Sequence, residues 1–308
     1  MKVLFTGIGS IAERHSRNLA AICAGEGIAL QMDALRRSRE PAQGISEIYC
    51  DASEVPDDYD IVFVTNPTTC HLNTLKRLNE KGKHFFVEKP AVIPDQTKEA
   101  AAFPFKQDAL YYVAGPLKYS AVVRYVREHI DPADVYSVRS ISSSYLPDWR
   151  PGRDYRETYS ARRESGGGVS IDLIHEWDYL TDLFGFPQRV SCYKGRKSGL
   201  EIDSDDYAIY IAEYTDKIAE VHLDYFGRKP VRRLELITKH DTIVGDLVDN
   251  TIRFLSSGET IAFGEERDDY QIRELKAFLE RIRGGETGHA SFLNALRVLS
   301  LTQGVLEE

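Results

Sequence analysis

Two residues three apart, Asp172 and His175, form the first group in this sequence that could do chemistry. Apolar residues at helical spacing predict a helix over about 169–184, which would place this carboxylate and imidazole on one face together with Tyr179. A carboxylate so placed can orient an imidazole or hydrogen-bond a substrate, so the pair is a candidate acid/base unit. The structural alternative is that His175 bonds a backbone carbonyl and Asp172 is an acid of the first helical turn.

A third candidate, Lys89, stands in Val87-Glu88-Lys89-Pro90, just past a predicted strand at 84–87. The carboxyl ends of strands in open α/β sheets are where ligands bind, which favours a functional lysine. The alternative is a solvated lysine in a charged turn.

A glycine loop near the N-terminus indicates a second kind of site. The run of residues 7–12, GIGSIA, fits GxGxxG/A between a predicted strand at 2–6 and a helix whose buried face runs through Ile11, His15, Leu19 and Ile22. The first glycine permits a tight turn, the second lets amides approach a pyrophosphate, and the helix N-terminus stabilises the phosphate charge. The motif predicts that a dinucleotide is bound by Gly7, Gly9, Ser10, Ile11 and Ala12. The alternative is a plain glycine turn.

The residues after the second predicted strand, 29–35, bear on the choice between NAD and NADP. That strand leads into Arg36, Arg37 and Ser38, while Asp33 lies inside it. Arginine and serine accommodate a 2'-phosphate, so the sequence favours NADP(H). If these arginines merely form a solvated basic turn, NAD(H) stays open.

The order of predicted elements gives the fold class. Strands alternate with helices as far as residue 114, which indicates a parallel, doubly wound sheet of the Rossmann type. After Gly115 and Pro116 the pattern changes to strands in succession at 135–145, 189–195, 206–214, 217–226, 232–238 and 251–255, which implies a large, mostly antiparallel open sheet. We therefore expect an α/β protein with a Rossmann domain at 1–116 and, at 117–308, an α+β domain that includes helices near 270–283 and 289–307.

A loop-like stretch before the 169–184 helix is dense in aromatic residues and arginines. Aromatic faces suit sugar rings, and arginine forks suit phosphate or carboxylate. We expect the stretch to cover a substrate, although it could instead pack its own aromatics. The residues expected to contact a substrate there are Tyr145, Trp149, Arg150, Tyr155, Arg156 and Tyr159.

Composition limits the function classes. The formal net charge of −9 argues against a nucleic-acid partner, because phosphate backbones are bound through Lys and Arg. No stretch approaches the roughly 18 apolar residues of a membrane helix, and the N-terminal run reads as a strand, not a signal peptide. The four cysteines lack any CxxC pair, so no metal site is expected. These features predict a cytoplasmic protein.

Several motifs taken together resemble the glucose-fructose oxidoreductase / inositol dehydrogenase / MocA family. They are the glycine loop, the run from Thr65 to His71, the Glu-Lys-Pro run and Gly166-Gly167-Gly168 leading into Asp172 and His175. The resemblance covers almost the whole chain. It implies an α/β second domain whose open sheet often mediates oligomers, here a homodimer or homotetramer. It also adds cofactor-binding residues, namely Thr65, Asn66, Pro67, His71, Glu88 and Lys89.

The resemblance further implies that NAD(P) oxidises or reduces a sugar or cyclitol hydroxyl. Such hydride transfer needs one group to handle the hydroxyl proton and another to stabilise charge on oxygen. Lys89, which resembles the lysine that contacts both nicotinamide and reacting oxygen, polarises that oxygen; His175 exchanges its proton, and Asp172 orients His175 or a hydroxyl. Many members space the acid and histidine four residues apart, whereas here they are three apart, and an HxxD continuation to Asp178 anchors His175.

The aromatic loop and the wording DLIHEWDYL resemble a branch seen among bacterial surface-carbohydrate enzymes, which points toward amino sugars or nucleotide-linked sugars. Two other functions remain open. One is a non-catalytic NAD(P)-binding regulator of the same fold. The other is a lyase or hydrolase that oxidises its substrate transiently and recycles bound NAD.

Overall fold

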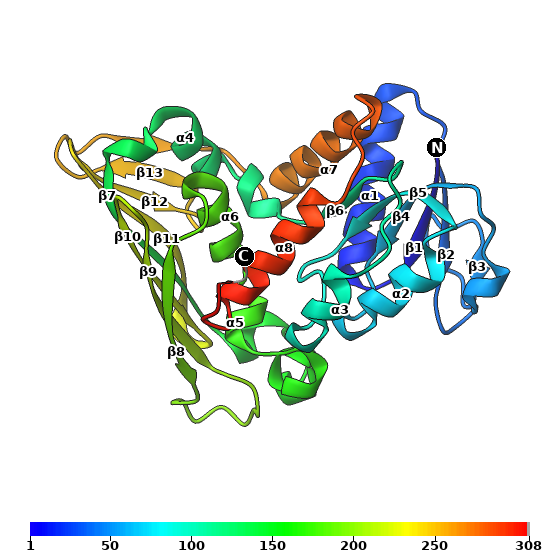
Figure 1. Ribbon diagram of the computed structural model, residues 1–308, viewed down its shortest axis with the longest axis horizontal. Coiled ribbons are helices and arrows are strands. Elements are labelled where there is room, and N and C mark those ends of the chain that lie inside the picture. Colours follow the sequence, from blue (N-terminus) through cyan, green and yellow to red (C-terminus); the bar gives the residue numbers. More distant parts are fainter. Residues whose placement is uncertain (307–308) are drawn as a thin grey trace. The chain divides into compact units, whose positions relative to one another are not determined.

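The computed structural model describes residues 1–306, and the chain divides into two compact units (Figure 1). The first unit comprises Met1–Pro116 and Arg267–Leu296. The second comprises Leu117–Glu266 and the described residues from Arg297 on. The chain therefore leaves the first unit after Pro116, builds most of the second, returns to the first at Arg267 and leaves it again after Leu296.

A six-stranded parallel sheet forms the centre of the first unit, with strand order β3-β2-β1-β4-β5-β6. Its strands are β1 (Lys2–Thr6), β2 (Gln31–Leu35), β3 (Ile48–Tyr49), β4 (Tyr59–Val64), β5 (Gly82–Val87) and β6 (Tyr111–Val113). Its helices are α1 (Ser10–Glu26), α2 (His71–Leu78), α3 (Thr97–Ala101) and α7 (Arg267–Arg283). The predicted Rossmann arrangement is confirmed.

Aromatic residues on neighbouring strands build the core of this unit. Phe5, Phe63 and Phe86 stack across β1, β4 and β5 with ring centroids 4.8 and 4.9 Å apart, and all three are fully buried. Phe278 of α7 meets the Phe86 ring edge-on at 5.2 Å. The strands β1 and β4 in the middle of the sheet are buried over most of their length, which is why their residues are mostly apolar.

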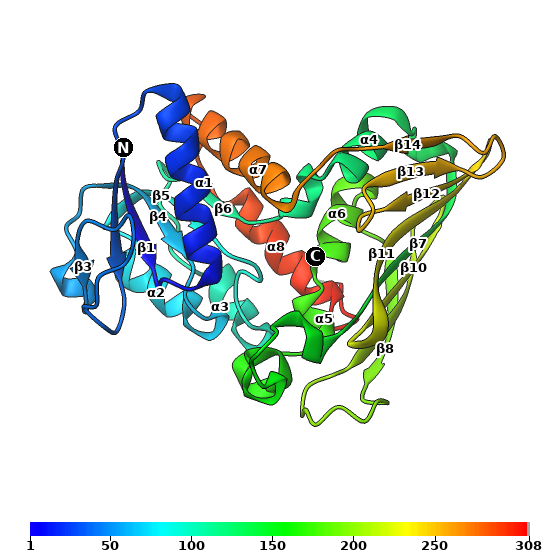
Figure 2. The same ribbon diagram turned by 180° about the vertical axis from the view of Figure 1, so that it is seen from behind.

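Helix α7 belongs to the first unit although it lies far along the sequence. It packs beside α1, as Figure 2 shows. Arg14 and Arg17 of α1 form ion pairs with Asp268 at 3.1 and 2.8 Å, and Arg283 pairs with Glu26 at the other end. The return of the chain thus completes the cover of one face of the parallel sheet.

An eight-stranded sheet dominates the second unit, in the order β14-β13-β12-β11-β7-β10-β9-β8. Within this sheet, as far as residues 1–306 describe it, β7 and β10 are the one parallel pair, which confirms the prediction of a mostly antiparallel sheet. The strands are β7 (Val135–Tyr145), β8 (Arg189–Gly195), β9 (Tyr207–Glu213), β10 (Ile218–Asp224), β11 (Phe226–Thr238), β12 (Thr242–Asp246), β13 (Thr251–Phe254) and β14 (Thr260–Ala262).

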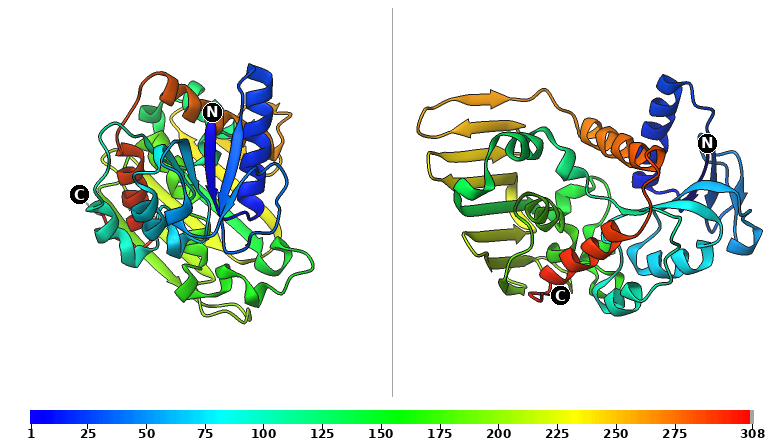
Figure 3. Two further views of the ribbon diagram at one scale, coloured as in Figure 1. Left: turned by 90° about the vertical axis from the view of Figure 1, so that its right-hand side faces the viewer. Right: turned by 45° about the horizontal axis from the view of Figure 1, so that its top comes forward.

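Helices cover one face of this sheet and leave the other bare (Figure 3). They are α4 (Ala121–His129), α5 (Val169–Asp172), α6 (His175–Phe184) and the last turns of α8 (Ala290–Leu301). Tyr179 of α6 reaches Ser140 of β7, hydroxyl to hydroxyl at 2.7 Å, and both residues are fully buried. The helices therefore lie directly over the middle of the sheet.

Candidate functional site

The glycine loop after β1 has the geometry of an anion cradle. Gly7 adopts φ +81°, a left-handed conformation that favours glycine, and its amide donates to Leu35 at 2.8 Å. A Cβ added at Gly7 would come within 3.4 Å of the Asn66 backbone, whereas one at Gly9 would meet nothing within 4 Å. Gly9 caps α1 without a side-chain hydrogen bond, so the first-turn amides at Ser10, Ile11 and Ala12 are oriented toward this open side. The residues fit a dinucleotide diphosphate.

Asp33 has a structural role in this unit. It is fully buried in β2, and its carboxylate accepts hydrogen bonds from the Tyr59 hydroxyl at 2.7 Å and the Glu47 amide at 3.1 Å. Burial and the bond to Asp33 raise the pKa of Tyr59 well above its usual value. Asp33 therefore serves the core and does not lie at the strand end, where a ribose-binding acid would stand.

The end of β2 carries positive charge. Arg37 is exposed and Arg36 is partly exposed, and among residues 1–306 neither side chain forms a hydrogen bond or ion pair. Arg39, by contrast, is engaged by both carboxylate oxygens of Glu54, at 2.9 and 3.0 Å. The two unengaged guanidinium groups and Ser38 leave a basic turn at this edge of the sheet.

The loop after β4 is tied to the glycine loop. The Thr65 hydroxyl donates to the Thr6 carbonyl at 3.0 Å, and the Asn66 side-chain amide donates to Thr74 at 2.7 Å. The other side-chain atom of Asn66, Oδ1, is buried with no hydrogen-bond partner in the described structure. A buried acceptor without a donor costs free energy, so Asn66 Oδ1 is a group that a bound ligand can satisfy.

His71 is buried and faces backbone carbonyls on both sides. Its Nε2 lies 2.8 Å from the Asn66 carbonyl, and its Nδ1 lies 3.1 Å from the carbonyls of Pro90 and Ala91. Burial lowers the pKa of His71, and the carbonyls and Glu88 oppose that shift. His71 thus lies between the loop after β4 and the segment after β5.

Lys89 follows β5, in the segment that His71 holds. The Lys89–Pro90 peptide bond is cis, and Lys89 is partly exposed. Its amide donates to Glu88 Oε2 at 3.2 Å, while Glu88 Oε1 lies 2.6 Å from Nε2 of the buried His15 on α1. Burial alone would raise the pKa of Glu88, but His15 and Lys89 hold it below its ordinary value.

In the second unit, the glycine run at 166–168 is required by close packing. A Cβ on Gly167 would lie 2.1 Å from the Tyr159 carbonyl oxygen, and one on Gly168, where φ is +126°, would lie 2.5 Å from the Asp205 carboxylate. Asp205 also accepts from the Ser170 amide at 2.9 Å. The glycines at 166–168 therefore allow the turn at 159–162 to pack closely against the start of α5, and α5 ends at Asp172.

The continuous helix expected over 169–184 is interrupted. Helix α5 ends at Asp172 and α6 begins at His175, because the intervening Leu173 leaves helical geometry at φ −96° and ψ +31°. The prediction that Asp172, His175 and Tyr179 share one helix face is therefore wrong. Tyr179 instead turns to the sheet, where Ser140 bonds its hydroxyl.

Asp172 lies among tyrosines. It is 6% exposed, and its Oδ2 accepts from the hydroxyl of Tyr225, a fully buried residue, at 2.6 Å. Burial and the neighbouring Asp172 raise the pKa of Tyr225 well above its usual value. The charge of Asp172 and burial also raise the pKa of Tyr159, which is 43% exposed. Sequence reasoning missed Tyr225, because this tyrosine lies within the predicted strand at 217–226 and belongs to no motif.

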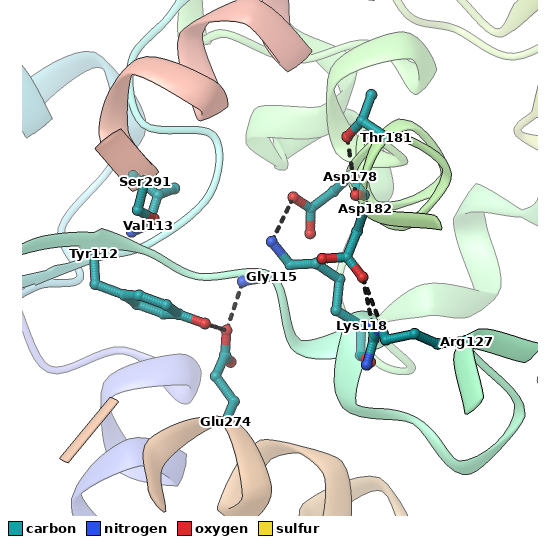
Figure 4. A network of polar contacts seen from close by, with 10 residues as sticks. All are labelled: Tyr112, Val113, Gly115, Lys118, Arg127, Asp178, Thr181, Asp182, Glu274 and Ser291. Atoms are coloured by element: carbon teal, nitrogen blue, oxygen red, sulfur yellow. Dashed lines mark hydrogen bonds and ion pairs between the residues drawn. The ribbon is translucent and has the colours of Figure 1, made fainter. Parts of the chain in front are cut away.

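His175 and Asp178 open α6. His175 is partly exposed at the first position of the helix, and Asp178 forms an ion pair with Lys118 Nζ at 3.0 Å. Figure 4 shows the ion pair between Asp178 and Lys118. It also shows a contact within the first unit, where the Glu274 carboxylate accepts hydrogen bonds from the Gly115 amide at 2.5 Å and the Tyr112 hydroxyl at 3.1 Å. Lys118 thus anchors the first turn of the helix that carries His175.

The aromatic stretch after β7 forms three short turns that contact one another. Trp149 donates from Nε1 to Ser144 at 2.9 Å and meets Tyr225 edge-on at 5.2 Å, and the Arg150 guanidinium lies 5.4 Å from the Tyr159 ring centre. A small hollow lies between these turns, and its lining includes Trp149, Arg150 and Tyr155.

Three of the residues expected in the substrate region, Tyr145, Tyr155 and Arg156, have other contacts. Arg156 is held by Asp154 at 2.7 Å and Glu201 at 2.6 Å, and Tyr145 lies under the Arg228 guanidinium at 3.9 Å. The Tyr155 hydroxyl accepts from the Glu201 amide at 3.1 Å. The structure thus brings Trp149, Arg150 and Tyr159 to the neighbourhood of Asp172, but engages Tyr145 and Arg156 elsewhere.

Within residues 1–306, no three His, Cys, Asp or Glu side chains are grouped so that they could hold a metal ion. No helix in that range combines the length and the apolar character needed to cross a membrane.

The fold and the glycine loop define a two-domain protein whose Rossmann unit fits a dinucleotide. Residues 1–114 match the oxidoreductase family with the NAD-binding Rossmann fold, and residues 123–244 match the GFO/IDH/MocA C-terminal domain. The chain belongs to the GFO/IDH/MocA oxidoreductase family, as its motifs indicated.

Curated relatives match part of the chain. The scyllo-inositol 2-dehydrogenase (NAD(+)) of Bacillus subtilis strain 168 is 27% identical over 189 residues, which cover 58% of this chain and 52% of the relative. The D-xylose dehydrogenase of Paenarthrobacter nicotinovorans is 25% identical over 144 residues, 45% of this chain and 37% of the relative. The matched region thus spans about half of the first relative and less of the second.

Solved structures match the fold over nearly the whole chain. A levoglucosan dehydrogenase in complex with NADH superposes with a TM-score of 0.85 at 18% identity, covering 99% of this chain and 95% of that one. The UDP-N-acetylglucosamine 3-dehydrogenase of Acidithiobacillus ferrooxidans gives 0.76 at 17% identity, with 99% and 96% covered. At these identities the likeness establishes the shared fold.

Proposed function

We propose that this protein is an NAD(P)-dependent dehydrogenase or reductase that acts on a hydroxyl or carbonyl group of a sugar or sugar derivative. One observation carries the proposal. The glycine loop follows β1, the Thr65–His71 loop follows β4, and Lys89 follows β5, and these three strands are parallel neighbours. The carboxyl ends of parallel strands meet at one edge, so an anion cradle and a lysine lie at the same edge of one sheet.

Each unit contributes its own groups to the proposed reaction. A bound nicotinamide supplies the hydride acceptor or donor. In the first unit, the Lys89 ammonium donates a hydrogen bond to the reacting oxygen and stabilises its developing charge. In the second unit, the His175 imidazole takes up or returns the hydroxyl proton, and Asp172, held by Tyr225, orients His175 or a substrate hydroxyl.

The test of this role is Lys89→Met. The variant is expected to bind the cofactor as the parent does but to lose turnover by several powers of ten, because it removes an interaction that strengthens in the transition state. Cofactor affinity is measured by quenching of tryptophan fluorescence and turnover by absorbance of reduced nicotinamide. Near-parental turnover of Lys89→Met overturns the proposal.

We infer further that the cofactor is NADP(H). Support comes from Arg36 and Arg37, unengaged at the end of β2, and from the burial of Asp33 away from the ribose position. The relative named for NAD(+) stands against it. The double variant Arg36→Ala/Arg37→Ala is expected to weaken NADP(H) at least tenfold with little change for NAD(H), because about 1.4 kcal/mol per charge-assisted bond corresponds to that factor. Arg39→Ala, which removes only the contact to Glu54, is the matched control. Equal effects on both cofactors contradict the inference.

We infer further that the substrate is an amino sugar or a nucleotide-linked sugar, and the aromatic and basic side chains of the turns after β7 support this inference. Trp149 offers an aromatic face and Arg150 an exposed guanidinium, which together suit an amino sugar or a nucleotide-linked sugar. Thermal-shift titration of the cofactor-loaded protein with phosphorylated and nucleotide-linked sugars tests this, since a true ligand stabilises the loaded protein selectively. Cofactor binding without turnover on the whole panel favours a regulator. Product formation without net change in reduced nicotinamide favours a lyase or hydrolase that recycles its cofactor.

We propose that the bare face of the second unit's sheet joins copies of the chain into a homodimer or homotetramer. Directly paired residues form a row across four strands of this face, namely Tyr193, Ile209, His222 and Ile141. Tyr193 is 68% exposed in one chain, and such a row of apolar side chains is costly to leave in water. Light scattering after size-exclusion chromatography is expected to give a dimer or tetramer that Ile209→Arg dissociates; a monomeric parent contradicts this.

A further inference from the structure

A buried imidazole and carboxylate connect the anion cradle to Lys89. His15 lies in α1, one turn beyond the amides at the start of that helix, and is 1% exposed. Its Nε2 lies 2.6 Å from Glu88 Oε1, and the other oxygen of Glu88 accepts the backbone amide of Lys89 at 3.2 Å. The three groups form one chain of hydrogen bonds from α1 to the lysine backbone.

The surroundings of His15 fix which atom carries its proton. The ring lies between Phe63 and Phe86, with centroids 5.7 and 5.1 Å away, so it cannot turn without displacing the core. Its Nδ1 is buried with no hydrogen-bond partner in the described structure. A proton on Nδ1 would be an unsatisfied donor, so the proton sits on Nε2 and is donated to Glu88.

Burying the His15–Glu88 pair costs free energy of folding. Two polar groups are taken out of water among aromatic rings, and replacing such a pair by apolar residues of similar size is often neutral or stabilising. A role in stability alone therefore does not account for placing a histidine against Phe63 and Phe86. What an apolar pair would lack is a directional bond to the backbone of Lys89.

We propose that His15 and Glu88 are positioning residues that set the backbone of Lys89 relative to the anion cradle on α1. This rests on the proposed function, in which Lys89 acts on the reacting oxygen. Glu88 is the link in the middle: one oxygen is fixed by α1 through His15, and the other receives the Lys89 amide. On the far side, His71 holds the carbonyls of Pro90 and Ala91, so the segment is fixed at both ends.

The first experiment reads the environment of Lys89 without cofactor or substrate. Lysines are reductively methylated with ¹³C-formaldehyde, and the Lys89 resonance is assigned by its loss in Lys89→Arg. The double variant His15→Met/Glu88→Leu replaces the pair by apolar side chains, so it removes both hydrogen bonds without leaving a buried unpaired charge. Its Lys89 resonance is expected to move in chemical shift and in titration midpoint, with a thermal midpoint at or above that of the parent. The control is His84→Gln, another histidine of this unit that makes one backbone hydrogen bond, to Leu110.

The second experiment reads turnover. The double variant is expected to lose about tenfold or more in kcat while its cofactor affinity stays within a small factor, because a misplaced catalytic group costs rate more than binding. His15→Gln, which keeps a donor for Glu88, should recover part of the loss. In a Lys89→Met background the double substitution should cause no further loss, since its effect acts through Lys89.

The two experiments separate this inference from the proposed function. A parent enzyme without turnover on any sugar would count against the proposed function, and the Lys89 resonance would still report on the pair. A folded double variant with an unchanged Lys89 resonance overturns the inference. So does a loss of kcat that persists in full in the Lys89→Met background.

Discussion

Tyr225→Phe removes one oxygen atom from beside Asp172 and nothing else. Tyr225 is fully buried and Asp172 is 6% exposed, so no water replaces the lost donor at 2.6 Å. A hydrogen bond to a charged group contributes about 1.5–3 kcal/mol, and the unfolding free energy of the second unit is expected to fall by that amount. If Asp172 takes part in turnover through this orientation, the same energy sets an upper bound of roughly 10- to 150-fold on the loss in kcat.

The matched control is Tyr179→Phe. Tyr179 is also fully buried in the second unit, but its hydroxyl meets the neutral Ser140 at 2.7 Å. A neutral hydrogen bond contributes about 1 kcal/mol, so Tyr179→Phe is expected to cost less stability and to leave kcat unchanged. Urea unfolding followed by tryptophan fluorescence and steady-state kinetics measure both quantities. Equal costs for the two variants in stability and in kcat would refute the assignment of Tyr225 to a charged partner.

Two further predictions concern packing and pH. Gly167→Ala places a Cβ within 2.8 Å of three backbone carbonyl oxygens and is expected to destabilise the second unit by about 3 kcal/mol. The control is Gly152→Ala, at φ +81° in open space, which should cost about 1 kcal/mol. Urea unfolding measures both free energies, and equal costs contradict the steric argument. Because burial lowers the pKa of His71 from 6.5, the folded state binds fewer protons than the unfolded state, and stability is lost as pH falls below about 6.5. His71→Gln should reduce the dependence of the unfolding free energy on pH in this range by up to about 1.4 kcal/mol per pH unit. Urea unfolding at several pH values measures this, with His129→Gln at an exposed site as the control. An unchanged slope for His71→Gln contradicts the prediction.

The parallel sheet was predictable because its signal is local. The central strands β1 and β4 are mostly apolar and buried, and the helices between strands have their own period, so element type and order follow from short windows. The strand β12 was missed because Gly245 interrupts its pattern. A glycine is needed at position 245 because a Cβ there would come within 2.7 Å of the Val122 side chain on α4. The window that contains β12 holds no sign of Val122.

The same limit explains the placement of α7. The periodicity of its apolar residues predicts a helix with one buried face. It does not indicate which element packs against that face. Phe278 finds its place against Phe86, about 190 residues earlier in the chain, and Asp268 pairs with arginines of α1. Sequence order placed this helix beside the antiparallel strands, whereas contacts group it with the first unit.

For the candidate site, motifs identified residues but not their partners. The spacing of Asp172 and His175 suggested an acid that orients its neighbour on one helix; the helix breaks at Leu173, and the partner that the structure gives to Asp172 is Tyr225 at the end of β10. Likewise His15 appeared as one more residue on the buried face of α1, and its bond to Glu88 emerges only when α1 and β5 pack. Tertiary packing determines which hydrogen-bond partners meet across elements. Functional residues that act through another residue are therefore the hardest to predict from a single sequence.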